Sequence, residues 1–350
     1  MIVRTETIDQ RIETYINDYQ PDKIVVVVSE TSEKLCLPKL QIYKKIDNII
    51  YHLPDGDEAK KITYCEDFWE SLLRENVTRK SLIIAVGGGA VLDFAGFCAS
   101  VYMRGLPCIY VPTTLLSMVD GSEGGKTGIN LYGTKNVIGT FTDPVAIMRN
   151  VDFLSTLNEC ELLSGWAEII KHALLTGGNL MELVKKGMPE SSDIEAWMNI
   201  IRENVIFKKG IVAEDFKEKG QRKLLNLGHT LGHGLEAIHF EDPKINHGIS
   251  IACGLYWESL LGYEMGFTNK ETFDLVSSLV FPLFPKIGWN EMEVEPMTNL
   301  LMHDKKNHNG KIQLSLLKSV GEASYDIEIS ETEINEYLTK YAMAVHESND

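Results

Sequence analysis

The sequence lacks the features that would place the chain in a membrane or on a nucleic acid. It contains no run of about 18 apolar residues, and its first residues, "MIVRTETIDQ", show no basic stretch followed by an apolar one. Positive charge is scarce, with 34 Lys and Arg against 50 Asp and Glu and a net charge of −16. Because nucleic acids and anionic membranes bind basic surfaces, we expect neither as a partner, and we expect a cytoplasmic protein.

Cysteine is scarce too, and the usual dinucleotide-binding fingerprint is missing. The six cysteines are scattered without a C-x-x-C pair, which predicts reduced thiols rather than disulfides or a cysteine metal site. No G-x-G-x-x-G follows an apolar run. Any nucleotide site must therefore use another turn.

The pattern of apolar residues divides the chain into two parts. The first 150 residues alternate short β-branched runs, such as "KIVVVVSE" and "SLIIAV", with helix-like stretches, one of them from Asp57 to about Asn76. Strands interleaved with helices predict an α/β domain with a mainly parallel sheet, residues 1–152. Long segments with 3.6-residue periodicity follow and predict an all-α domain, residues 153–350.

Three consecutive glycines interrupt the first part. In "AVGGGAVLDF", residues 85–94, they stand between a buried strand and a helix start. Such a turn can hold a pyrophosphate through its amides and the helix dipole, although a merely tight turn has the same spacing. Asp93 would point from the first helical turn toward that site, or would only balance the dipole.

The segment "RKLLNLGHTLGHGLEA" carries polar groups that are unusual for a solvated helix face. Read as one helix, it places Arg222, Asn226, His229 and His233 on one stripe. Each of its three glycines lowers the stability of a helix by about 1 kcal/mol relative to alanine. We therefore expect something to approach this backbone closely.

Two histidines four residues apart have the spacing of a helical metal site. His229 and His233 could equally be structural. A third ligand could come from His247 in "INHGIS" or from Glu168 in "WAEIIKHALL", where Lys171 could also form an ordinary surface pair with Glu168. One carboxylate and two imidazoles suit Zn²⁺ with an open position.

Basic residues recur in polar turns of this acidic chain. Lys126 follows two glycines, and Lys135 and Asn136 lie in "YGTKNVIG". Arg104, Lys208, Arg222 and Lys305 or Lys306 stand in similar surroundings. If they cluster, they would bind a phosphate and a carboxylate; singly, they would be solvent-exposed.

Taken together, these motifs resemble the 3-dehydroquinate synthases, a family of sugar-phosphate cyclases. The resemblance runs in order through "GGGAVLDFAGFCASVYMRG", "GGKTGINLYGTKNVIG", "SGWAEIIKHAL", "RKLLNLGHTLGHGLE", "NHGIS" and "HDKKNHNGKI", about residues 50–320. It implies an NAD-binding first domain and a metal-binding second one. It further implies conversion of 3-deoxy-D-arabino-heptulosonate 7-phosphate to 3-dehydroquinate and phosphate, with NAD⁺ reduced and reoxidised within each turnover.

The resemblance also implies roles for individual residues. Glu168, His229 and His247 would bind Zn²⁺ or Co²⁺, and His233 would face the substrate phosphate instead. Residues implied to line the substrate pocket are Asp120, Lys126, Lys135, Asn136, Lys171, Lys208, Arg222, Asn226 and Lys305 or Lys306. Arg104 would complete the phosphate site, either within its own subunit or from the partner subunit of a homodimer. Residues implied to bind NAD are Glu30, Asp57, Lys60, Gly88, Gly89, Asp93, Thr113 and Thr114.

The chain departs from the family pattern at a few positions. "HGISI" replaces the common H-G-E-A, Asp57 stands where glutamate is usual, and "HGLE" has glycine for alanine. Three alternatives remain: a cyclase for another sugar phosphate, a metal-dependent polyol dehydrogenase, or a binding protein without activity. The phosphate-binding lysines would have no purpose in a polyol dehydrogenase.

Overall fold

The structure is a computed structural model that divides into two compact units. It describes residues 2–3, 5–44, 47–132, 134–239, 242, 245–284, 287–303, 307 and 310–342. Unit 1 comprises residues 1–162 and 189–209, and unit 2 comprises residues 163–188 and 210–350. Residues 153–162 and 189–209 thus group with the first half rather than the second, and the boundary at residue 152 stays a prediction. Helical periodicity shows which face of a helix is buried but not which unit buries it.

Unit 1 is built on a five-stranded parallel sheet. Its order is β3 (Ile49–Leu53), β2 (Ile24–Ser29), β4 (Leu82–Gly87), β5 (Cys108–Pro112) and β8 (Ala146–Ile147). Every neighbouring pair runs parallel. All residues of β2 and β4 are buried, as expected of β-branched runs covered on both faces. The predicted parallel α/β fold is confirmed.

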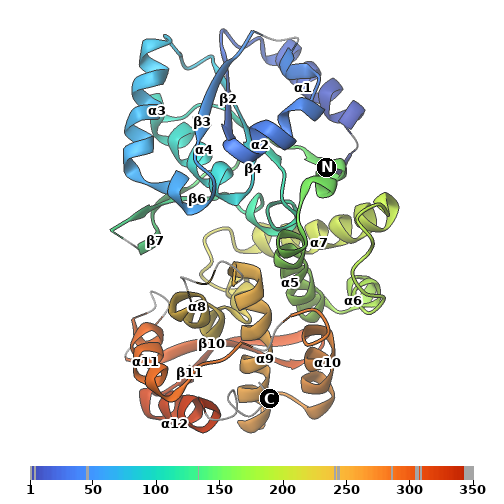
Figure 1. The fold of residues 1–350 in the computed structure, drawn as a ribbon, viewed down its shortest axis with the longest axis vertical. Coiled ribbons are helices and arrows are strands. Elements are labelled where there is room, and N and C mark those ends of the chain that lie inside the picture. Colours follow the sequence, from blue (N-terminus) through green and yellow to red (C-terminus); the bar gives the residue numbers. More distant parts are fainter. Residues whose placement is uncertain are drawn as a thin grey trace. The chain divides into compact units, whose positions relative to one another are not determined.

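Helices flank this sheet (Figure 1). They are α1 (Thr5–Tyr19), α2 (Glu30–Leu35), α3 (Ile62–Arg74) and α4 (Gly89–Val101). Val25 and Val27 of β2 share one core with Phe68 of α3 and Phe94 of α4. The helix predicted from Asp57 is in fact a 3-10 turn, η3 (Gly56–Lys60), followed by α3 after one extended residue.

Shorter elements complete unit 1. A hairpin joins β6 (Lys126–Leu131) to β7 (Thr134–Phe141), and a short parallel pair joins β1 (Ile2–Val3) to β9 (Arg149–Asn150). The short helical turns are η1 (Leu37–Lys39), η2 (Ile42–Lys44), η4 (Tyr102–Arg104), the π-helical η5 (Ser117–Gly121) and η6 (Val151–Thr156). We expected Lys126 and Lys135 in turns. Instead, Lys126 is the first residue of β6, and Lys135 is the second residue of β7.

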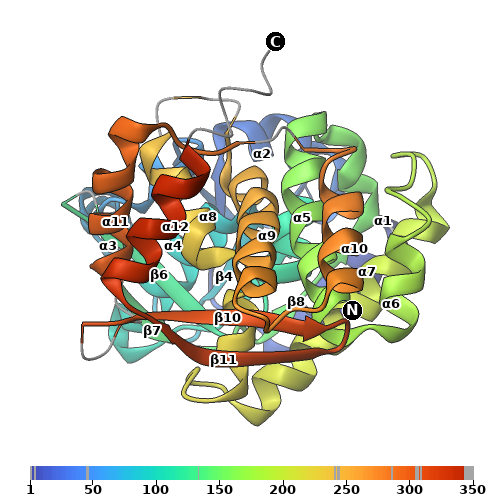
Figure 2. The ribbon, with the colours of Figure 1, turned by 90° about the horizontal axis from the view of Figure 1, so that it is seen from below.

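The second half is rich in helices, as predicted. They are α5 (Glu159–Thr176), α6 (Gly178–Val184), α7 (Ile194–Glu214), η7 (Gln221–Asn226), α8 (His229–Ile238), α9 (His247–Glu264), α10 (Lys270–Val280), η8 (Glu291–Glu293), α11 (Val294–Met302) and α12 (Glu331–Ala342). It is not purely α-helical, because β10 (Ile312–Ser319) and β11 (Glu322–Ile329) form an antiparallel hairpin that runs across the helices of unit 2 (Figure 2). Gly321, with a φ of +80°, makes the tight turn between them.

The segment predicted as one long helix around His229 is broken. η7 ends at Asn226, and α8 begins at His229 after Gly228, whose φ is +76°. Arg222 and Asn226 therefore do not share a helix stripe with the histidines, and that prediction was wrong. Only glycine adopts this left-handed conformation without strain.

The predicted close approach to this glycine-rich backbone is confirmed. It is made by α9: a Cβ on Gly232 would lie 3.1 Å from the Ser250 carbonyl oxygen. A Cβ on Gly254 of α9 would lie 2.0 Å from the carbonyl oxygen of Gly228. The glycines thus allow α8 and α9 to pack backbone against backbone.

Candidate functional site

The residues predicted to bind a dinucleotide follow the carboxyl ends of four parallel strands in unit 1. Glu30 follows β2, Asp57 and Lys60 follow β3, Gly88 and Gly89 follow β4, and Thr113 and Thr114 follow β5. Because the strands are parallel, these positions share one edge of the sheet, where open α/β sheets bind ligands.

The glycine turn after β4 has the shape of a phosphate cradle. Gly88 caps α4 without any side-chain hydrogen bond, so the first amides of the helix have no side-chain acceptor there. A Cβ on Gly88 would lie 3.2 Å from Cγ2 of Thr114, whereas a Cβ on Gly89 would meet nothing within 4 Å. The turn therefore offers open space beside a helix N-terminus, which suits a pyrophosphate.

Lys60 joins this edge of the sheet to the β6–β7 hairpin. Its Nζ lies 2.6 Å from Oδ2 of Asp93 in α4 and also donates to Oδ1 of Asn136 in β7. Burial raises the pKa of Asp93, while the charge of Lys60 opposes that shift. One residue earlier in the hairpin, Lys135 Nζ lies 3.0 Å from Oδ2 of Asp57. Predicted cofactor residues of η3 thus contact predicted substrate residues of β7.

A second cation, Lys208 in α7, holds the π-helical turn η5. Its Nζ lies 2.7 Å from Oδ1 of Asp120 and 2.6 Å from the Asp120 carbonyl oxygen. Asn204, one turn earlier, donates to the Val119 carbonyl at 2.8 Å. π-Helical turns recur at functional sites, and this one presents Asp120. Lys126 and Arg104, also predicted site residues, are exposed.

In unit 2 the structure brings Glu168, His229 and His247 together from three helices. Oε1 of Glu168 lies 3.4 Å from Nε2 of His229 and 3.7 Å from Nε2 of His247. One ligand atom from each residue falls within 4.8 Å of the others. Two ligands of one tetrahedral zinc ion, each about 2.0–2.1 Å from it, lie about 3.4 Å apart. The three side chains therefore fit a divalent metal ion.

The carboxylate of Glu168 has an unusual environment. It is fully buried, and neither oxygen has a hydrogen-bond partner among the described residues, although Lys171 forms an ion pair with Oε2. Burial alone would raise the pKa of Glu168, but Lys171 and His229 hold it well below its usual range. A metal ion bound between this carboxylate and the two imidazoles would compensate the buried negative charge, which lacks hydrogen bonds.

The two imidazoles differ in pKa. Burial, and then the charge of Lys171, lower the pKa of His229 to about 4, which favours its neutral ring. Burial also opposes a charge on His247, but its contacts with Glu168 and Glu236 raise its pKa to about 9. A metal ligand must be neutral at the coordinating nitrogen; His229 already meets this condition.

Two further carboxylates support the cluster, and neither was predicted from the sequence. Oε2 of Glu236 in α8 lies 3.0 Å from Nδ1 of His247. Glu258 of α9, fully buried, accepts the N–H groups of Gly228 at 2.6 Å and Leu231 at 2.9 Å, and so caps α8. Glu258 is the only charged residue of α9 between its first turn and Glu264, a signal that could have identified it.

The structure also describes His233, Arg222 and Asn226 among the predicted residues of unit 2. The ring centroid of His233 lies 5.2 Å from that of His229 and 5.8 Å from that of His247. Arg222 is buried and donates to the Phe216 carbonyl at 2.6 Å, and Asn226 donates to Glu218 at 2.8 Å. Lys305 and Lys306 lie outside the described residues.

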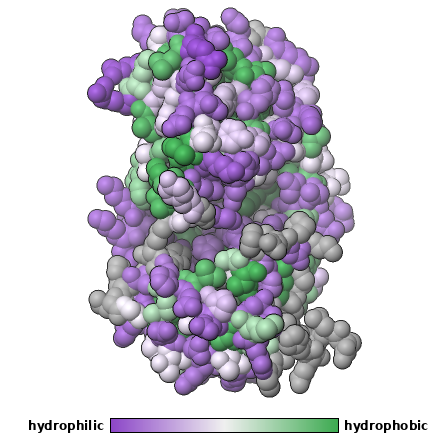
Figure 3. All heavy atoms as spheres, turned by 60° about the vertical axis from the view of Figure 1, so that its left-hand side comes forward, coloured by the Kyte–Doolittle hydropathy of each residue, from purple (hydrophilic) through white to green (hydrophobic). Residues whose placement is uncertain are grey.

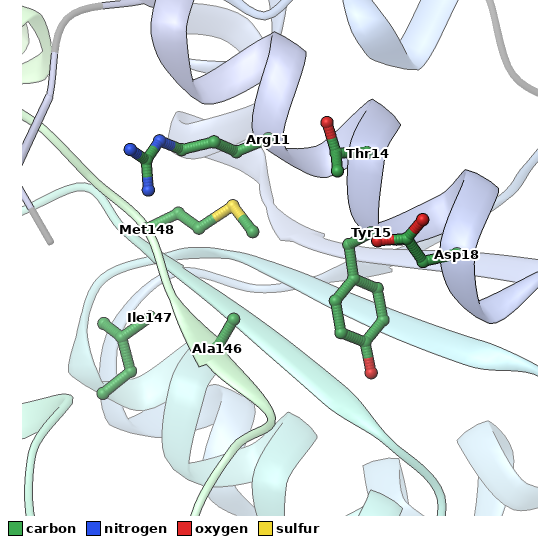
Figure 4. Close-up of a pocket in the computed structure, with 7 residues that line it drawn as sticks. All are labelled: Arg11, Thr14, Tyr15, Asp18, Ala146, Ile147 and Met148. Atoms are coloured by element: carbon green, nitrogen blue, oxygen red, sulfur yellow. The ribbon is translucent and has the colours of Figure 1, made fainter.

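One pocket of unit 1 lies elsewhere, between α1 and the edge of the sheet (Figure 4). It encloses about 410 Å³, and its lining residues are Arg11, Thr14, Tyr15, Asp18, Ala146, Ile147 and Met148. None of them belongs to the predicted site.

On the face shown in Figure 3, hydrophilic residues predominate and apolar ones are interspersed. Among the described residues, no helix has the length and apolar character needed to span a bilayer.

Known proteins match the chain over nearly its whole length. The N-terminal domain of 3-dehydroquinate synthase matches residues 50–164, and the C-terminal domain matches residues 165–307. A 3-dehydroquinate synthase of Pyrococcus furiosus is 38% identical over 315 residues, which cover 89% of this chain and 90% of the relative. One of Parabacteroides distasonis is 30% identical over 344 residues, 97% of either chain.

A solved structure shares the fold. It is 2-deoxy-scyllo-inosose synthase in complex with carbaglucose-6-phosphate, NAD⁺ and Co²⁺, with a TM-score of 0.86 and 21% identity. The alignment covers 97% of this chain and 96% of that one. With both domains matched in order and relatives at 30–38% identity, the chain belongs to the 3-dehydroquinate synthase family.

Proposed function

We propose that this protein is an NAD- and metal-dependent 3-dehydroquinate synthase. It would convert 3-deoxy-D-arabino-heptulosonate 7-phosphate to 3-dehydroquinate and phosphate, a carbon–oxygen lyase reaction of the shikimate pathway. The observation that carries the proposal is the grouping of Glu168, His229 and His247 around one metal-sized position in a chain of this family. The family's cations are also present, at Lys126, Lys135 and Lys208 among others.

The two cofactors would be held in different units. The edge of the parallel sheet in unit 1 would bind NAD⁺, which supplies a reversible hydride acceptor when bound. Glu168, His229 and His247 of unit 2 would bind Zn²⁺ or Co²⁺, which supplies a Lewis acid that lowers the pKa of a substrate hydroxyl.

The remaining side chains would bind and orient the substrate. We assign Lys126, Asn136, Arg104 and His233 to its phosphate, because cations and imidazole N–H groups form charge-assisted hydrogen bonds with phosphate oxygens. Lys208, Arg222 and Lys135 would hold the carboxylate and hydroxyls. Asp120, Lys171, Asn226 and Lys305 or Lys306 would complete the substrate-binding residues. Holding the phosphate in place also positions it as a leaving group.

A direct assay tests the function. The protein would be incubated with the heptulosonate phosphate, a catalytic amount of NAD⁺ and a divalent metal, and phosphate release would be followed together with NADH absorbance. We expect stoichiometric phosphate without accumulating NADH. NADH accumulation with a neutral polyol would instead support the dehydrogenase alternative, and phosphate release only from another sugar phosphate would support a different cyclase.

Replacing Gly89 with alanine should weaken NAD⁺ binding without unfolding the protein. The new methyl group meets no protein atom within 4 Å, but it would occupy the space that a pyrophosphate needs. We expect an NAD⁺ dissociation constant about tenfold higher or more, measured by calorimetry, and an unchanged melting temperature. Gly87→Ala is the contrasting variant, since its Cβ would lie 2.6 Å from Cβ of Val91 and destabilise the fold. Normal NAD⁺ affinity in Gly89→Ala would contradict the cradle.

Replacing Lys126 with alanine should impair turnover while both cofactors still bind. A charge-assisted hydrogen bond to phosphate contributes about 1.5–3 kcal/mol, so kcat/KM should fall about 10- to 100-fold or more. Lys80→Ala, which removes the same charge from another exposed site of unit 1, serves as the control and should keep full activity. A normal rate for the Lys126 variant would remove this residue from the phosphate site.

We also propose how the protein assembles and where it is located. The family resemblance supports a homodimer to which Arg104 contributes across subunits, and a cytoplasmic location. The net charge of −16 supports the absence of a nucleic-acid partner.

A further inference from the structure

The imidazole of His247 is held on both sides by carboxylates. Its Nε2 lies 3.7 Å from Oε1 of Glu168, and its Nδ1 lies 3.0 Å from Oε2 of Glu236. The side chain of Glu236 is 19% exposed and that of His247 34% exposed, so the contact is partly shielded from water. Nδ1 therefore donates its proton to Glu236, and Nε2 is the nitrogen that faces Glu168.

The two histidines are oriented by different acceptors. Nδ1 of His229 lies 3.0 Å from the carbonyl oxygen of Leu227, a neutral acceptor two residues earlier in the chain. His247 instead uses a charged acceptor supplied by another helix, α8. A carboxylate on the far nitrogen fixes the tautomer of a metal-binding histidine and makes the ligand more basic.

We propose that Glu236 is a positioning residue that orients His247 toward the metal and strengthens it as a ligand. This inference rests on the proposed metal site. Glu236 lies on the same helix as His229, so α8 contributes one ligand directly and orients another ligand that belongs to α9. The pair also couples the C-terminal half of α8 to the first turn of α9.

The geometry leaves one competing role for Glu236. His233, Glu236 and His247 could also offer one ligand atom each within 4.8 Å, which would make Glu236 a ligand itself. That arrangement would leave the buried carboxylate of Glu168 without a metal ion. We therefore favour the positioning role.

The test compares metal affinity across four variants of the full-length protein. Zn²⁺ affinity would be measured by competition with a chelating indicator. The coordination of the metal would be compared through the visible absorption spectra of the Co²⁺-loaded forms. For Glu236→Ala we expect one metal ion per chain, bound about 10- to 100-fold more weakly, with an altered Co²⁺ spectrum. Glu236→Gln keeps an acceptor for Nδ1–H and should lose less. His233→Ala and Glu182→Gln, a surface charge control on α6 that is 68% exposed, should bind metal normally.

Each outcome separates the possibilities. Unchanged affinity and spectrum in Glu236→Ala would overturn the positioning role. Complete loss of the metal in Glu236→Ala together with weakened binding in His233→Ala would overturn it in favour of direct ligation. A wild-type protein that binds no divalent metal would overturn both this inference and the proposed metal site. A lower melting temperature of the metal-free Glu236 variants with unchanged metal affinity would show a purely structural role and would also overturn it.

Discussion

Replacing Glu168 with alanine is expected to abolish metal binding and to lower the free energy of unfolding of the metal-free protein by about 3–5 kcal/mol. The side chain of Lys171 is 2% exposed, and Glu168 is its buried ion-pair partner. Removing the carboxylate leaves a buried ammonium without its counter-charge, which costs more than the pair itself contributes. Metal content by atomic emission and stability by urea unfolding would measure the two losses separately.

A second substitution distinguishes the metal role of Glu168 from its structural role. In the double variant Glu168→Ala with Lys171→Met, no buried charge is left unpaired, so much of the stability should return while the metal stays absent. Glu182 and Lys185 have the same spacing of three residues on an exposed helix face, and Glu182→Ala should therefore change stability little. Stoichiometric metal in Glu168→Ala would disprove the assignment of this ligand.

Replacing Gly254 with alanine is the second change with a large expected effect. The new Cβ would lie 2.0 Å from the Gly228 carbonyl oxygen and 2.7 Å from the Gly232 amide nitrogen. Because both are backbone atoms, α8 and α9 would have to separate, and we expect a loss of about 3 kcal/mol or more in the free energy of unfolding. Separating these helices also moves His229 away from His247, so metal affinity should fall as well.

A glycine of α7 provides the matched control. Gly210 is exposed in a helix, and a Cβ there would meet nothing within 4 Å. Gly210→Ala should stabilise the protein by up to about 1 kcal/mol and leave metal binding unchanged. If Gly254→Ala were as stable as the wild type, the close contact between α8 and α9 would not matter for the fold.

The cofactor edge of unit 1 could be predicted from the sequence because its chemistry is tied to strand order. Once β2, β3, β4 and β5 are parallel, the residues after each strand must share an edge, and Gly88 and Gly89 are found there. The hairpin β6–β7 was not anticipated. Its lysines looked like loop residues because short polar strands lack an apolar periodicity.

The metal cluster shows where sequence spacing fails. His229 and His233 had the spacing of a helical pair, but the residue that completes the cluster with Glu168 and His229 is His247, from another helix. The resemblance to a family implied His247 as the ligand, whereas periodicity could not. The break at Gly228 was missed for a related reason. The spacing of apolar residues does not show where a glycine adopts the left-handed conformation and ends a helix.

Helix α9 fixes the distance between two functional contacts in unit 2. Its first residue, His247, belongs to the metal cluster, and Glu258, eleven residues later, closes the start of α8. Eleven residues make about three full turns and roughly 16 Å, so both side chains project from the same face of the helix. One inserted or deleted residue between them would rotate one end by about 100° relative to the other. Related enzymes that keep both contacts should therefore keep the length of this stretch unchanged.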